Sequence, residues 1–119
     1  MLKTLIAILL MSISCIVVAE PLTQDEKQTE LIVGLTLLGD MAQTLDIKRH
    51  PGIYEANKIL GKHPSDAKIV TYFATVGVLH YELVKALPSR WRPEAQVGVI
   101  LFEVLVMVHN KQGGVSFKF

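Results

Sequence analysis

The sequence predicts an all-α fold, in which an N-terminal signal segment is followed by a three-helix antiparallel bundle embedded in a membrane. Three observations lead to this prediction: an apolar N-terminal run, three long segments with helix start and stop signals, and a thin stripe of polar residues along each segment. A surface helix of a soluble protein is normally polar over a wide face, so stripes this thin indicate helices surrounded by lipid or by protein.

Residues 1–19 have the pattern of an export signal. Lys3 provides the positive start, residues 5–19 form an apolar run, and Ala19 is the small residue preferred before a cleavage site. The run is shorter than the roughly 20 apolar residues of a membrane span, which favours a cleaved signal and leaves a signal anchor as the alternative. The lone Cys15 would leave with the signal, so we expect no disulfide or thiol chemistry in the mature chain.

The composition limits the functions to consider. Half of the 119 residues are hydrophobic, and 12 basic residues accompany 11 acidic ones. This composition excludes a disordered tail, and it excludes nucleic acid as a partner bound through excess positive charge. The part of the chain after residue 19 is long enough for one domain.

The first helix is predicted over residues 24–47, at the start of a helical domain that covers residues 20–110. Thr23 and Glu26 form the capping-box pattern at its beginning. The sequence Lys-Arg-His-Pro-Gly follows Ile47, and its proline and glycine end the helix.

Two further helices complete the predicted bundle. Ser65 can cap a helix over residues 66–87, which a proline then ends. Pro93 suits the first turn of a helix over residues 93–110, which stops before two consecutive glycines. Residues 111–119 are expected to form a C-terminal tail.

The polar stripes place two acids at a common depth. Asp40, Gln43 and Thr44 share one face of the first helix, and Glu103 lies well inside the third. At 1.5 Å per residue, both acids lie about 10 Å from the inner ends of their helices. Two carboxylates at one depth away from water repel each other, so they are expected to share a proton or a cation. The interpretation that we favour is that Asp40 only fixes helix packing through hydrogen bonds, because helices of marginal hydrophobicity need such polar contacts.

The candidate polar site joins these acids to other polar residues near that level or in the following loop. Its members are Asp40, Gln43, Thr44, Glu55, Asn57, His80, Glu103 and His109. The four histidines lack the i, i+4 pairing of a zinc site, so no metal and no other cofactor is expected. Patterns for a catalytic triad or a phosphate loop are missing, so an enzymatic activity is not favoured.

Hydrophobicity alone leaves the membrane position open. Eight Leu, Ile and Val residues lie between residues 31 and 47. Each favours insertion by about 0.3 to 0.6 kcal/mol, whereas a central Asp opposes it by roughly 2.5 to 3.5 kcal/mol. Basic residues cluster in the loop after the first helix, which the positive-inside rule places inside. We therefore expect an exported protein of the inner membrane, with the periplasm as the alternative location.

Several short motifs in the mature chain resemble a group of small, uncharacterised helical proteins of the bacterial envelope. The motifs are Asp40-Met41-Ala42-Gln43-Thr44, Tyr54-Glu55-Ala56-Asn57, Ile59-Leu60-Gly61 and His63-Pro64-Ser65 followed by Tyr72-Phe73-Ala74. The similarity covers roughly residue 40 to the C-terminus, and this chain has Lys58 where the group tends to have proline. The resemblance implies an envelope location and a helical fold, and it implies no activity.

Two classes of function follow from the sequence. The first is a small helical membrane protein with a structural or interaction role, whose partners are membrane lipid and either other membrane proteins or a second copy of itself. The second is a membrane-embedded carboxylate site that passes protons or binds a cation. An exported soluble bundle is a further alternative.

Overall fold

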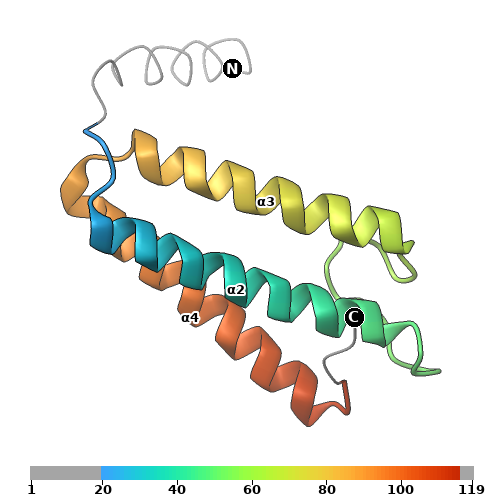
Figure 1. Cartoon of the computed structure of the whole chain (residues 1–119). Coiled ribbons are helices and arrows are strands. Elements are labelled where there is room, and N and C mark those ends of the chain that lie inside the picture. Colours follow the sequence, from blue (N-terminus) through green and yellow to red (C-terminus); the bar gives the residue numbers. More distant parts are fainter. Residues whose placement is uncertain (1–19, 116–119) are drawn as a thin grey trace, which may run out of the picture.

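The protein, seen here as a computed structural model that describes residues 20–115, is a bundle of three long helices (Figure 1). The elements are α2 (Gln24–Ile47), α3 (Asp66–Ala86), the short 3-10 helix η1 (Ser89–Trp91) and α4 (Arg92–Gln112). The described residues contain no strand. The expected signal over residues 1–19 and residues 116–119 of the expected tail lie outside the described part.

The helix boundaries follow from local hydrogen bonds. At the start of α2, Thr23 and Glu26 form the expected capping box: the Glu26 amide donates to Thr23 Oγ1 at 3.2 Å, and the Thr23 amide donates to Glu26 Oε2 at 2.8 Å. Ser65 Oγ accepts from the Lys68 amide at 3.2 Å at the start of α3. The C-terminal end of α4 at Gln112 lies two residues beyond the predicted end.

The chain reverses direction between successive long helices, so α3 is antiparallel to α2 and to α4, and α2 is parallel to α4 (Figure 1). The side-chain contacts agree with this arrangement. Arg92 bonds Glu26, 66 residues away, and Gln43 bonds the Met107 backbone, 64 residues away. A nearly constant separation along both helices means that they rise in the same direction. α2 is the central helix, because it packs against both neighbours whereas α3 and α4 contact each other lightly.

The apolar core lies mainly between α2 and α3. It contains Val33 and Leu37 from α2, Ile69 and Phe73 from α3, and Leu60 from the loop between them. Leu60 is 2% exposed and covers the end of the core, while Gly61 beside it has a φ of 81° that a residue with a side chain rarely adopts.

The interface between α2 and α4 is polar, and α4 is inverted relative to an ordinary surface helix. The buried residues of α4 are Arg92, Gln96 and Glu103. Its outward face carries Val97, Leu101, Phe102, Val104, Leu105 and Val108, all of them exposed. The helix therefore turns its polar stripe toward α2 and its apolar side away from the bundle.

Within residues 20–115, no helix has both the length and the apolar content needed to cross a membrane.

Candidate functional site

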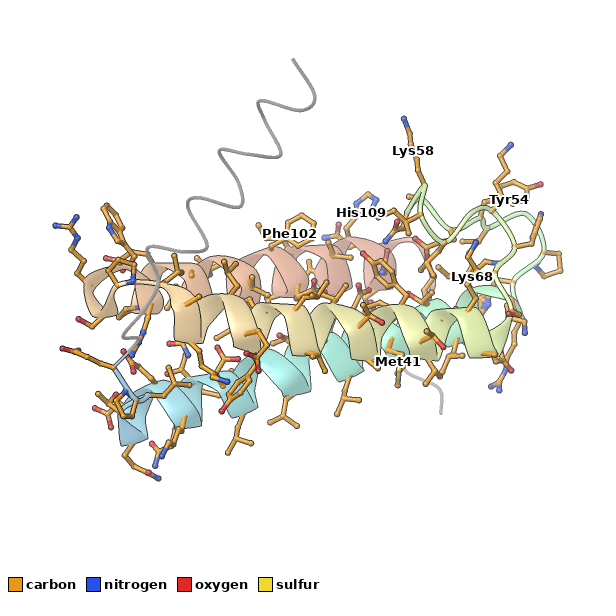
Figure 2. The ribbon with its side chains drawn as sticks, turned by 90° about the horizontal axis from the view of Figure 1, so that it is seen from above. Met41, Tyr54, Lys58, Lys68, Phe102 and His109 are labelled. Carbon is orange, nitrogen blue, oxygen red and sulfur yellow. The ribbon has the colours of Figure 1, made fainter. Side chains whose placement is uncertain are left out.

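A cleft of about 690 Å³ opens at the end of the bundle where the long loop after α2 meets the helices. Leu37, Asp40 and Thr44 of α2 line its base, and both α3 and α4 contribute walls. The cleft forms where α3 and α4 diverge, because little direct packing holds these two helices together. In Figure 2, Phe102 and His109, which both line the cleft, project from the same side of α4.

The floor of the cleft holds a pair of carboxyl groups, Asp40 from α2 and Glu103 from α4, which hydrogen-bond to each other. Burial raises the pKa of Glu103 to about 8, and the charge of Asp40 and the hydrogen bond with Asp40 add to this effect. Burial also raises the pKa of Asp40 to about 6, although the hydrogen bond from Glu103 opposes the shift. Near neutral pH, the pair therefore carries one proton and one negative charge.

Two amide side chains hold this part of α2 against α4. Asn110 Nδ2 donates to Asp40 Oδ1 at 3.4 Å and to Gln43 Oε1 at 3.1 Å. Gln43 is fully buried, and its Nε2 donates to the Met107 carbonyl at 3.0 Å. These bonds satisfy a buried amide and fix the distance between the two helices beside the acids.

The loop brings two further predicted residues, Glu55 and Asn57, to the cleft. Their hydrogen bonds are local: Glu55 Oε1 accepts from the Asn57 amide at 2.7 Å, and Asn57 Oδ1 accepts from the Ile59 amide at 2.9 Å. These bonds shape the turn. The charge of Glu55 also raises the pKa of Asp40, so the loop affects the acid pair through space.

Seven of the eight predicted site residues line this cleft or brace it. Asp40, Thr44, Glu55, Asn57, Glu103 and His109 line it, and Gln43 lies behind it. Thr44 is buried, whereas His109 is exposed at the rim.

His80 does not join this site. Its Nδ1 lies 3.3 Å from Glu30 Oε2, and Gln96 Nε2 donates to Glu30 Oε1 at 2.8 Å. Glu30 precedes Asp40 by ten residues in α2, which corresponds to about 15 Å along the helix. His80 was expected about one to two turns further out than Asp40 and still within the candidate site, but it contacts Glu30 instead, toward the opposite end of α2.

A second polar cluster, which the sequence reasoning missed, surrounds Arg92 at that opposite end. The guanidinium is 1% exposed. It lies 3.3 Å from Glu26 Oε2 and donates to four carbonyl oxygens, those of Glu20, Pro21, Lys85 and Leu87. The sequence did carry a signal for this cluster. Glu26 and Glu30 lie four residues apart, as do Arg92 and Gln96, so each pair shares one face of its helix.

The donor set of the cleft defines its chemistry. Its acidic residues are Asp40, Glu55 and Glu103, and no Lys or Arg among the described residues lines the cleft. Within residues 20–115, no three His, Cys, Asp or Glu side chains are arranged to hold a metal ion. The cleft can therefore exchange a proton or accept a cationic group.

Comparison of this chain with protein-family models, with curated proteins and with solved structures gives no match.

Proposed function

We propose that the protein is a small, non-catalytic association module of a bacterial-type cell envelope, whose main partner is membrane lipid. The inverted orientation of α4 is the observation that carries this proposal. Its polar residues Gln96 and Glu103 are buried against α2, while its apolar residues face outward. In water, a helix gains stability from the opposite orientation, so the outer face of α4 suits an apolar surrounding.

The apolar character of the outer surface extends beyond α4. In the described part of the chain, 18 large hydrophobic side chains are exposed, compared with 10 hydrophobic residues in the core. Four of the exposed residues, Val97, Leu101, Val104 and Val108, form one stripe along α4. Contiguous exposed apolar surface of this kind marks a site of contact with protein or with membrane.

Lipid is the preferred partner because the apolar side chains are spread over all three helices. A protein partner normally covers one patch and leaves the remainder of the surface polar. Here Leu31 and Leu35 of α2, Val78 and Leu79 of α3, and Leu105 of α4 are all more than half exposed. Acyl chains can adapt to several such faces, because they need no fixed orientation relative to the protein. The proposal does not require any helix to cross the bilayer.

A flotation experiment tests the proposal. The purified full chain is mixed with vesicles of phosphatidylethanolamine and phosphatidylglycerol and centrifuged through a density gradient. We expect the protein to float with the vesicles. A double variant, Leu101→Gln with Val108→Gln, should bind at least about tenfold more weakly, since each buried apolar side chain contributes roughly 1.5 to 3 kcal/mol.

Glu94→Gln serves as the matched control, because Glu94 is an exposed polar residue on the same helix. It should float like the parent protein. If the parent stays at the bottom of the gradient and sedimentation shows a dimer that the double variant disrupts, a second copy covers these faces and the lipid proposal is wrong.

The acid pair supports a second candidate function, proton exchange. Asp40 and Glu103 share a proton on the floor of an open cleft, and their pKa values of about 6 and about 8 bracket neutral pH. In this role, Asp40→Asn would abolish activity in the host while leaving the abundance of the protein unchanged. If the Asp40→Asn variant fully restores the function of a strain that lacks the protein, the proton-exchange role is excluded.

A further inference from the structure

We propose that the cleft between α3 and α4 binds an organic cation that carries an apolar body, such as a primary ammonium compound. The floor of the cleft would receive the ammonium group, and its walls would receive the apolar body. This site lies between the helices, and its rim shares Phe102 and Leu105 with the outward face of α4. Its acid pair takes no part in the proposed lipid association, so the inference does not depend on that association.

The unused hydrogen-bonding capacity of Glu103 points to a ligand. Glu103 is 7% exposed and lines the cleft, yet its Oε2 has no hydrogen-bond partner in the described structure. A buried carboxyl oxygen without a hydrogen-bond partner is costly, and native proteins normally satisfy such atoms. An ammonium group brings three donors and a positive charge, and therefore suits this oxygen.

The charges around the acid pair favour a cation over an anion. From α2, Asp40 faces Glu103; from the loop, Glu55 adds a second negative charge; and from α4, His109 stands at the rim. α3 contributes Tyr72 to the lining. A carboxylate or phosphate ligand would meet like charges here, whereas a cation would relieve their repulsion.

The walls favour an organic cation over a metal ion. The cleft is lined largely by aliphatic and aromatic side chains, including Leu37, Phe73, Val76 and Phe102. An apolar body buries surface against these walls, and their aromatic faces can attract an adjacent ammonium group. The volume of about 690 Å³ lies within the roughly 300 to 1,000 Å³ typical of sites for small organic molecules.

Binding of a cation should release a proton. The pair holds one proton near pH 7, because the pKa of Glu103 is raised to about 8. An ammonium group beside Glu103 stabilises its ionised form, so the carboxyl group should lose up to about one proton for each ligand bound. This release distinguishes binding at the acid pair from adsorption to an apolar surface elsewhere on the protein.

Calorimetry with three matched probes tests the proposal. The full chain, free of lipid, is titrated at pH 7 with 4-phenylbutylamine, 4-phenylbutanol and 4-phenylbutyrate, which share an apolar body and differ in charge. We expect the amine to bind about tenfold more tightly than the alcohol, as one charge-assisted hydrogen bond would provide. The carboxylate should bind most weakly. Repeating the amine titration in buffers of different ionisation enthalpy measures the proton release.

Variants assign the preference to the acid pair. Glu103→Gln should bring the amine and the alcohol to within about twofold of each other and abolish the proton release, whereas Glu94→Gln on the same helix should change neither. Asp40→Asn provides a second variant should Glu103→Gln fail to fold, and it should also reduce the preference for the amine. Equal binding of amine and alcohol to the parent, absence of saturable binding, or an amine preference that persists in both folded acid variants would overturn the proposal.

Discussion

Asp40 and Glu103 hydrogen-bond to each other between two parallel helices, and both carboxyl groups have raised pKa values. Burial is the largest cause for each residue. The pair joins the polar faces of α2 and α4 while adding unfavourable electrostatic energy when both groups are ionised. The free energy of unfolding of the bundle should therefore change with pH as this pair gains or loses protons.

The first prediction concerns this pH dependence. The pKa of Glu103 is raised from 4.5 to about 8 in the folded chain, so the folded state binds more protons than the unfolded state between these values. The free energy of unfolding should consequently fall as pH rises, by about 3 to 4 kcal/mol from about pH 5 to about pH 8. Urea denaturation at several pH values measures it. Glu103→Gln should flatten most of this dependence and Glu94→Gln should not; a profile that rises over this range would contradict the assignment.

The second prediction separates the two acids. Asp40→Asn keeps an oxygen that can accept from Asn110 and removes the charge that helps to raise the pKa of Glu103. We expect the pKa of Glu103 to fall below its present value of about 8, as a carbon-13 NMR titration of the carboxyl groups would show. Asp40→Leu should instead destabilise the fold by about 1 kcal/mol, the scale of one hydrogen bond. An unchanged Glu103 titration in Asp40→Asn would show that the two groups are uncoupled.

The third prediction concerns the buried guanidinium of Arg92. Arg92→Met removes the charge that faces Glu26 and leaves four carbonyl oxygens without this donor. The free energy of unfolding should fall by about 3 kcal/mol, because a buried charge then lacks its partner. Arg90→Met, at an exposed position two residues earlier, should change it by less than about 0.5 kcal/mol. Similar losses for both variants in chemical denaturation would refute a special role for Arg92.

The fourth prediction compares two glycines by thermal or urea unfolding. Gly61 has a φ of 81°, so Gly61→Ala should strain the loop and destabilise the protein by about 1 kcal/mol. Gly98 lies within α4, and a methyl group added there meets no atom within 4 Å. Gly98→Ala should stabilise the protein by about 0.5 to 1 kcal/mol, because alanine is the better helix former. Effects of equal sign would show that backbone conformation is not the deciding factor.

The all-helical fold could be predicted because its signals are local. The capping box at Thr23, the cap at Ser65 and the proline at position 93 each act within one helical turn. The common level of Asp40 and Glu103 could also be estimated, since it needs only helix starts and the rise per residue.

The orientation of each stripe could not be predicted in the same way. A polar stripe on α3 that includes Thr71 and Thr75 faces outward, and the Thr75 hydroxyl donates to the Thr71 carbonyl of the same helix. The stripe on α4 faces inward. Periodicity identifies a face of a helix, but the rotation of that face depends on the neighbouring helices. The buried network around Arg92 was missed for the same reason, because it forms only when the polar faces of α2 and α4 meet.

The parallel pairing of α2 with α4 has a consequence for the order of events during synthesis. Glu26 and Glu30 are each bonded to a residue 66 positions later in the chain. At roughly 5 to 20 residues per second, a ribosome needs about 3 to 13 seconds to add those residues. Throughout that interval the nascent α2 lacks the groups that later satisfy its polar face. Its acids must stay hydrated until the last third of the protein emerges, and premature contact with an apolar environment would trap the helix before its correct neighbour exists.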